Sequence, residues 1–319
     1  MTTLQNKAFL VTGGAGFIGS HLTDKLLMLG AEKVVCVDNM FLGKKENLEK
    51  ATKHDNFVFY KQDASDYKKM KEICEKENIE ICFDMATISL PASLTEPAFC
   101  VKEIISIAET QCDLAKNGFY KTLLHFSSSE VYGTANEKFM SESHPLDPHT
   151  PYAAAKAGAD HIVNSYGKTF GIDYTIVRPF NNFGPRQNKT IYAAVIPITV
   201  ERVLSGQPPI IEWDGKQSRD FTFVEDTVEA AIQLYLTKKA RGQTVNIGSG
   251  REVTIGELIE NISSLMGYKG KIIRKPKRPG DVRRHCGDIS LAKKLIGYKP
   301  KTDFTQGLKK TIDYYKTRK

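Results

Sequence analysis

Residues 12–19, Thr-Gly-Gly-Ala-Gly-Phe-Ile-Gly, stand between a short apolar run at 8–12 and a helical pattern at 17–29. Gly13, Gly16 and Gly19 allow a tight turn and a close approach of the backbone to a phosphate group. The start of the helix that follows presents free N–H groups and a partial positive charge. The stretch therefore predicts a strand–turn–helix unit that holds a pyrophosphate, with contacts from Gly13, Gly16, Phe17, Ile18 and Gly19.

Strand and helix patterns alternate along the chain after this unit. Short apolar, β-rich runs predict strands at 33–38, 57–60, 81–85, 122–127 and 174–177. Longer patterns between them predict helices at 67–76, 98–116 and 152–170. Such alternation is typical of a parallel sheet built from right-handed βαβ units. We therefore predict an α/β protein with a Rossmann-type, doubly wound parallel sheet.

The pattern changes after Arg178, where a smaller, mixed α/β region is expected. This region is predicted to hold a polar loop at 181–189, strands at 221–224 and 244–247, and helices at 193–204, 227–236, 255–266 and near the terminus. No flexible linker separates the two parts, so we expect them to pack around a cleft. The dinucleotide-binding domain is predicted at 1–177, with 219–247 returning to it. The C-terminal substrate domain is predicted at 178–218 and 248–319.

Asp38 lies at the end of the second predicted strand. This is where a dinucleotide-binding fold with such a glycine turn carries an acidic residue. A carboxylate at this place accepts hydrogen bonds from the adenosine ribose and repels the 2′-phosphate of NADP, so NAD is the predicted cofactor. Asp63, after the third strand, is placed to meet the adenine amino group, although a surface turn explains it equally well. Asn39, Ala64 and Ala86 complete the predicted cofactor contacts.

Tyr152 and Lys156 lie four positions apart on a predicted helix, and therefore one turn apart on the same face. To act as a base near neutral pH, a tyrosine needs a pKa well below its reference value of ~10. A nearby ammonium and the positively charged nicotinamide ring can lower it. The preceding strand ends in a turn at the sheet edge where ligands of such folds bind, and this turn contains Ser128, Ser129 and Glu130.

Taken together, these motifs resemble those of the extended short-chain dehydrogenase/reductase family of nucleotide-sugar epimerases, dehydratases and decarboxylases. The similar segments span nearly the whole chain in order. Besides 12–19 they are Ser-Ser-Ser-Glu-Val-Tyr-Gly at 127–133, Pro-Tyr-Ala-Ala-Ala-Lys at 151–156, Arg-Pro-Phe-Asn-Asn-Phe-Gly-Pro-Arg at 178–186, Arg-Asp-Phe-Thr-Phe-Val-Glu-Asp at 219–226, Asn-Ile-Gly-Ser-Gly at 246–250 and Arg-Pro-Gly-Asp at 278–281.

The resemblance implies that the reaction begins with a transient 4-keto sugar. Tyr152 would take the proton of the sugar 4-hydroxyl with help from Ser128, while hydride passes from C4 to NAD. Lys156 would also hold the nicotinamide ribose, so both Tyr152 and Lys156 are expected to touch the cofactor as well as to serve catalysis.

The resemblance also implies the partners of the chain. The expected substrate is a nucleotide-diphosphate sugar, and guanidinium groups suit its phosphates. Members of the family commonly pair through the two helices that correspond to 98–116 and 152–170, so we expect a homodimer. The substrate contacts are predicted to come from Asn181, Arg219, Arg278 and Val195.

Glu130 bears on the step that follows the oxidation. Simple 4-epimerases of the family carry a small or hydroxyl residue there, whereas 4,6-dehydratases and uronic-acid decarboxylases carry glutamate. Ser129, where many dehydratases have aspartate, is similar to GDP-mannose dehydratases and UDP-glucuronate decarboxylases. In contrast, Arg219-Asp220 is similar to dehydratases and epimerases. We predict a 4,6-dehydratase, with 4-epimerisation and decarboxylation as alternatives, and count Glu130 and Ser129 among the catalytic residues.

Two departures from the family pattern stand out. Asp84-Met85-Ala86-Thr87 lies where the family has His-Leu-Ala-Ala, and Glu212-Trp213 lies where it has Tyr-Gly in the nucleotide pocket. A further alternative, of a different class, is a catalytically silent NAD-binding regulator. The presence of Ser128, Tyr152 and Lys156 together argues against it, because a regulator has no need of a proton acceptor.

Composition narrows the remaining classes. The formal net charge is +8, but no aromatic-interleaved basic module accompanies it, so phosphates of a small ligand are favoured over nucleic acid. No apolar run approaches the ~18 residues of a membrane span, and no signal peptide is recognisable. The six cysteines lack C-x-x-C spacing, so we expect reduced thiols, a cytoplasmic location and no metal site.

Overall fold

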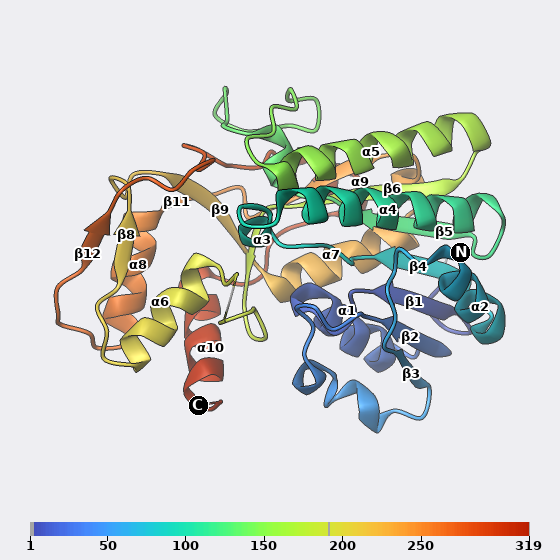
Figure 1. Ribbon diagram of the computed structural model, residues 1–319, viewed down its shortest axis with the longest axis horizontal. Helices are drawn as coiled ribbons and strands as arrows, with labels where there is room; N and C mark the ends of the chain where they lie inside the picture. The colour runs from blue at the N-terminus through green and yellow to red at the C-terminus, as the bar shows by residue number, and fades with distance from the viewer. Residues whose placement is uncertain (1–2, 191, 319) are drawn as a thin grey trace.

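The computed structural model describes residues 3–190 and 192–318, and a seven-stranded parallel sheet lies at its centre (Figure 1). The strand order is β10-β6-β5-β4-β1-β2-β3, so the chain starts in the middle and winds outward in both directions. This confirms the expected Rossmann-type fold. The strands are β1 (Ala8–Thr12), β2 (Lys33–Val37), β3 (Phe57–Tyr60), β4 (Ile81–Asp84), β5 (Thr122–Phe126), β6 (Asp173–Pro179) and β10 (Thr244–Ile247).

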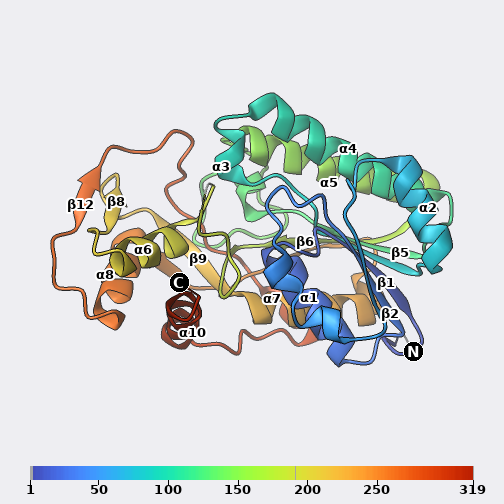
Figure 2. The same ribbon diagram turned by 60° about the horizontal axis from the view of Figure 1, so that its bottom comes forward.

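Helices cover both faces of this sheet, as Figure 2 shows. Alternation along β1 explains the two layers, because successive strand residues point to opposite faces. Phe9 and Val11 pack in the core under α1 (Phe17–Met28), α7 (Val224–Leu236) and α9 (Ser290–Ile296). Leu10 packs in the core on the other face, under α2 (Tyr67–Glu77), α4 (Pro97–Lys116) and α5 (Pro151–Phe170).

A smaller lobe stands beyond the carboxyl ends of the strands. Its core gathers around Phe183, Phe221 and Phe223, whose rings meet edge to face. Two small sheets and three helices build it: β11 (Glu252–Thr254), β9 (Ser218–Phe223) and β7 (Asn181–Phe183) form one sheet, β12 (Ile273–Lys275) and β8 (Ile210–Glu212) the other, with α6 (Val195–Leu204), α8 (Ile255–Leu265) and α10 (Phe304–Lys316).

The sequence-based boundaries of the later elements needed correction. The expected loop at 181–189 begins with β7, which pairs in parallel with β9. The expected strand at 221–224 starts at Ser218 and gives way to α7 at Val224, so the helix begins before the expected 227. Within the expected return segment 219–247, β9 joins the small sheet, while α7 and β10 join the large one.

Candidate active site

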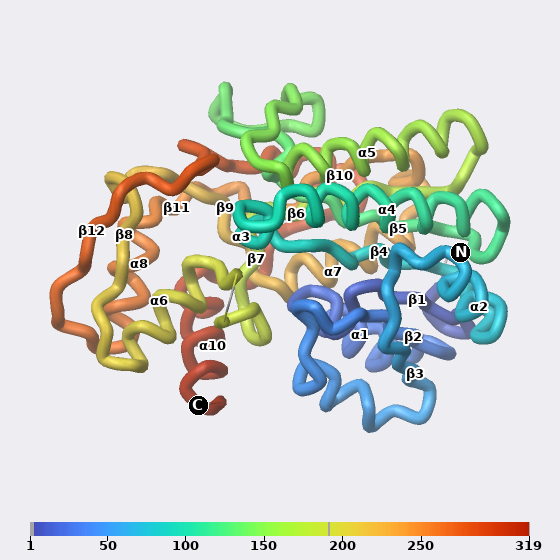
Figure 3. The backbone as a smooth tube through the Cα atoms, viewed as in Figure 1, coloured from blue at the N-terminus to red at the C-terminus, as the bar shows by residue number. Residues whose placement is uncertain are grey.

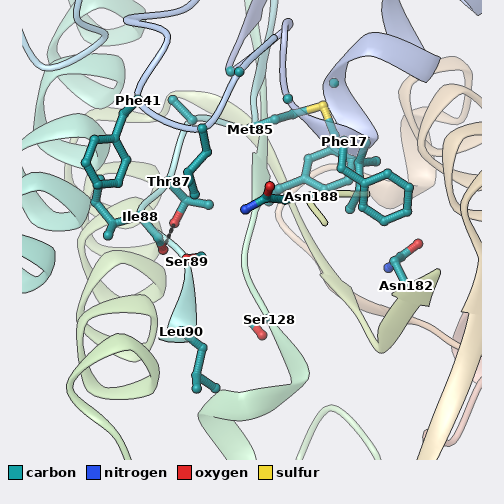
Figure 4. A pocket seen from close by; sticks show the side chains of 18 of the residues that line it. Phe17, Phe41, Met85, Thr87, Ile88, Ser89, Leu90, Ser128, Asn182 and Asn188 are labelled. Carbon is teal, nitrogen blue, oxygen red and sulfur yellow. Dashed lines mark hydrogen bonds between the residues drawn. The ribbon is translucent and has the colours of Figure 1, made fainter. Parts of the chain in front are cut away.

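A pocket opens where the large sheet meets the smaller lobe (Figure 4). The residues just past β1, β4, β5 and β6 line its floor, as expected for ligand sites in open α/β sheets. The loop after β2, the segment 85–91 and residues 186–188 also line the pocket. The pocket therefore joins segments far apart in the sequence, and every predicted catalytic and cofactor residue lines it.

The glycine turn is packed so closely against neighbouring backbone that two of its positions have no room for a side chain. Gly13 has φ +65°, and a Cβ there would lie 2.9 Å from the Cα of Ala86. A Cβ on Gly19 would collide with the carbonyl oxygen of Gly13. No side chain caps the start of α1, so its N–H groups remain available to an anion. These features fit the pyrophosphate of a dinucleotide.

Asp38 lies at the rim of this turn and is buried. Its carboxylate accepts hydrogen bonds from the N–H of Ala15, at 3.0 Å, and of Met40, at 2.8 Å. Burial raises the pKa of Asp38, and the backbone hydrogen bonds oppose that rise. Nearby, the Asn39 side chain donates to the Asp63 carboxylate at 2.9 Å. The turn is thus held in place by a carboxylate that also faces the pocket.

Tyr152, Lys156 and Ser128 meet at the pocket floor. Thr150 caps α5 and Pro151 begins it, which places Tyr152 in the first turn of the helix. The buried Lys156 ammonium donates to the Phe126 carbonyl at 2.7 Å. The Ser128 hydroxyl accepts from the N–H of Glu130, which leaves its own proton for the hydrogen bond with Tyr152.

The protein alone does not make Tyr152 a stronger acid. Burial raises the pKa of Tyr152, and only the hydrogen bond with Ser128 counters it among the leading causes. Burial also lowers the pKa of Lys156, while Asp84 and Asp160 oppose that change. Asp160 also raises the pKa of Tyr152, so the described residues by themselves favour the protonated phenol, and the positive charge of a bound nicotinamide ring is what would favour the phenolate.

A buried polar network underlies this group. The Asp84 carboxylate accepts from the Thr12 hydroxyl and forms a 2.8 Å hydrogen bond with Nδ1 of His125. Asp160 accepts from Ser127 and pairs with Arg178, both at 2.9 Å. These contacts tie the ends of β1, β4, β5 and β6 to α5, so they fix the helix that carries Tyr152 and Lys156.

Glu130 and Ser129 have different surroundings. The Glu130 side chain lines the pocket and is 15% exposed. Ser129 also borders the pocket but is 2% exposed. Behind Glu130 lies His285, whose Nδ1 is 3.8 Å from a carboxylate oxygen. The site therefore contains one carboxylate able to take a proton beside the tyrosine.

Comparison with known proteins agrees with this geometry. A family model described as GDP-mannose 4,6 dehydratase matches residues 10–311. The UDP-glucose 4-epimerase of Mycolicibacterium smegmatis is 33% identical over 311 residues, which cover 97% of this chain and 98% of that one. The chain belongs to the extended short-chain dehydrogenase/reductase family of NAD-dependent epimerases and dehydratases. It is therefore an enzyme of the family that includes nucleotide-sugar epimerases, dehydratases and decarboxylases.

Solved structures of family members show the same fold. The UDP-glucose 4-epimerase of Thermotoga maritima, solved with UDP-glucose, has a TM-score of 0.91 at 34% identity and covers 98% of this chain and 99% of its own. The dTDP-glucose 4,6-dehydratase DesIV of Streptomyces venezuelae, solved with NAD, has a TM-score of 0.92 at 28% identity and covers 97% of each chain. Both reactions thus occur on this fold.

The four predicted substrate contacts are not brought together. Asn181 lines the pocket, and its side-chain oxygen has no partner among the described residues. Arg219 is buried outside the pocket lining, where it binds Asp281 and donates to the carbonyls of Ser218 and Val282. Arg278 and Val195 also lie outside the pocket lining, and Val195 packs in the core of the smaller lobe. Their role as substrate contacts stays a prediction.

Several pocket residues were not among the predicted ones. Arg186 lines the pocket while one nitrogen pairs with Asp24 at 2.6 Å, and its other terminal nitrogen is buried without a partner among the described residues. The family motif at 178–186 ends on this arginine and was its only signal. Phe41 and Tyr192 also line the pocket, where their rings stack on each other, and no sequence pattern connects these two loop residues.

All six cysteines are buried and unpaired. No group of three or more potential ligands suited to a metal ion occurs among residues 3–190 and 192–318. Within the same residues, no helix is long and apolar enough to cross a membrane.

Proposed function

We propose that this enzyme is a nucleotide-sugar 4,6-dehydratase, which oxidises C4 of the sugar and then removes water across C5 and C6. The observation that carries the proposal is Glu130, a carboxylate that lines the same pocket as Tyr152 and Ser128. A 4-epimerase needs a proton acceptor only at the C4 oxygen. Removal of the C5 proton needs a second base, and Glu130 supplies one.

Each residue at the pocket floor has a separate role in this reaction. Tyr152 accepts the proton of the 4-hydroxyl, and Ser128 donates a hydrogen bond that stabilises the phenolate. Lys156, Asp38 and the turn at 13–19 would hold NAD. When bound, NAD would accept the hydride from C4 of the sugar. Glu130 then takes the C5 proton, whose acidity is raised by the neighbouring ketone.

The second candidate is 4-epimerisation of the same 4-keto sugar. Two observations favour it: Ser129 stands where an acid for the leaving hydroxyl is expected, and 4-epimerases from two organisms are 33% and 34% identical to this chain. In that case Glu130 is only a turn residue.

Mass spectrometry separates these outcomes. The purified enzyme is incubated with NAD and, in turn, with UDP-glucose, dTDP-glucose, GDP-mannose and UDP-glucuronate. A dehydratase removes the mass of water from one of them, a decarboxylase removes carbon dioxide, and an epimerase leaves the mass unchanged but alters the sugar on chromatography. Absence of change with all four, together with no reduction of NAD, would contradict the proposal and favour the silent regulator.

NAD is expected to bind ~10- to 100-fold more tightly than NADP, because the Asp38 carboxylate would face the 2′-phosphate at the rim of the pocket. Asp38→Asn should narrow this preference, since the amide keeps one acceptor but loses the charge. Calorimetric titration with both nucleotides measures the effect. Asp66→Asn, at the cap of α2 and outside the pocket lining, is the matched control and should keep the preference. Equal affinity of the unaltered enzyme for both nucleotides would refute the role of Asp38.

A homodimer is expected to form through α4 and α5, which lie side by side on one face (Figures 1 and 2). Val101 and Phe170 on these helices are 38% and 50% exposed. Light scattering should give twice the chain mass of 35.6 kDa. Val101→Glu should shift the mass toward the monomer, whereas Met28→Glu, on the opposite layer, should not. A monomer at micromolar concentration before any substitution would rule out the interface.

A further inference from the structure

His285 lies behind the pocket, next to Glu130, and has no role in the steps proposed above. The segment 282–288 runs beside the loop that follows Ser127–Gly133, drawn in green above the sheet in Figure 3. Backbone hydrogen bonds join them from Ala135 to Arg284 and from Met140 to Cys286. The imidazole is completely buried, and it reaches Glu130 across 155 positions of sequence only because of this pairing.

The hydrogen bonds of His285 define its tautomer. Nε2 lies 2.5 Å from the carbonyl oxygen of Gly133. A carbonyl has no proton to give, so Nε2 must carry the proton and donate it. In the neutral ring, Nδ1 then keeps its lone pair. Nδ1 has no hydrogen-bond partner among the described residues.

The groups around the ring decide its charge. Glu130, Arg219 and Asp281 are the charged side chains that act on it, and Phe180 packs against it edge-on. Burial lowers the pKa of His285, Arg219 lowers it further, and the two carboxylates oppose that change. The resting imidazole is therefore neutral, with a bare nitrogen 3.8 Å from a Glu130 oxygen.

We propose that His285 is a positioning residue that receives, through Glu130, the proton removed from C5 of the substrate. The inference rests on the proposed function. The C5–H bond breaks, its electron pair remains as the enolate of the 4-keto sugar, and the proton passes to a Glu130 oxygen. Rotation of the protonated carboxyl brings it to Nδ1, where the proton is held as imidazolium beside a restored carboxylate.

The pairing of Glu130 with His285 explains how the site can work with a serine at position 129. A serine hydroxyl is not an acid near neutral pH, so Ser129 cannot replace the aspartate that many dehydratases have there. The proton stored on His285 returns through Glu130 to the departing C6 hydroxyl, which leaves as water. C6 then takes back the hydride that was removed from C4, and C5 takes the proton that Tyr152 removed from the 4-hydroxyl, so atoms and charge balance. Glu130 and His285 then act as a single proton store.

His285→Gln is the informative variant. The glutamine amide can still donate to the Gly133 carbonyl, but it offers no proton acceptor at the place of Nδ1. In single turnovers with the sugar identified by the panel, NADH should form within about twofold of the normal rate. Its decay should slow by ~10-fold or more, within the range of general acid–base groups.

A matched control and a substrate-free measurement complete the test. His144→Gln should change neither rate, since both ring nitrogens of His144 bind the backbone near the same segment. ¹⁵N-imidazole NMR of the unaltered enzyme should show the His285 signal, assigned by its loss in His285→Gln, with Nε2 protonated and Nδ1 bare at neutral pH. A protonated Nδ1, or normal NADH decay in His285→Gln, overturns the inference. Failure of every sugar to reduce NAD instead overturns the proposed function, while the NMR result still tests the tautomer.

Discussion

Tyr152→Phe is expected to abolish both NAD reduction and product formation, with a loss of at least ~10²–10⁴-fold. The variant keeps the ring but removes the one hydroxyl that hydrogen-bonds Ser128 at the pocket floor. Without it, the proton of the sugar 4-hydroxyl has no acceptor as hydride leaves C4. Every later step depends on the ketone, so none can proceed.

Absorbance of NADH in single turnovers and mass spectrometry of the sugar measure this loss. Tyr166→Phe is the matched control, because Tyr166 lies on the same helix and its hydroxyl donates to Asp113 at 2.9 Å, outside the pocket. This control should lose about 1 kcal/mol of stability and little activity. Residual NAD reduction near the normal rate in Tyr152→Phe would show that another group is the base.

The large sheet could be predicted because its strands are apolar runs with clear helical patterns between them. The parallel sheet then fixes where its loops meet, so the glycine turn, Asp38, Ser128 and Tyr152 could be brought together from the sequence alone. The strands β8, β11 and β12 escaped prediction because each has only three residues, too few to show a period.

The substrate side of the site was harder to predict, because its contacts depend on the smaller lobe. Arg219 looked like a phosphate ligand by motif, but its partner Asp281 stands 62 positions away and was not visible as a pair. His285 lies next to Glu130, and no sequence motif predicted this contact. Such contacts come from packing between distant segments, and local residue patterns carry no trace of them.

Glu130→Gln is expected to separate the two stages of the reaction. C4 oxidation should proceed within a fewfold of normal, since it uses Tyr152 and Ser128, whereas loss of water should fall by ~10²–10⁴-fold. NADH and a 4-keto sugar should therefore accumulate together on the enzyme. Absorbance of NADH followed over a single turnover, with mass spectrometry of the quenched sugar, measures both stages.

The amide preserves the shape of the side chain, and its backbone N–H still donates to Ser128, so altered packing is a poor explanation of such a result. Glu137→Gln, an exposed residue of the following loop, is the matched control and should behave normally. Normal turnover of Glu130→Gln would make Glu130 a turn residue and leave no base for C5. The tyrosine and serine would then suffice for the whole reaction, and the enzyme would be a 4-epimerase. In such an enzyme the 4-keto sugar rotates in the cleft before hydride returns to the opposite face of C4.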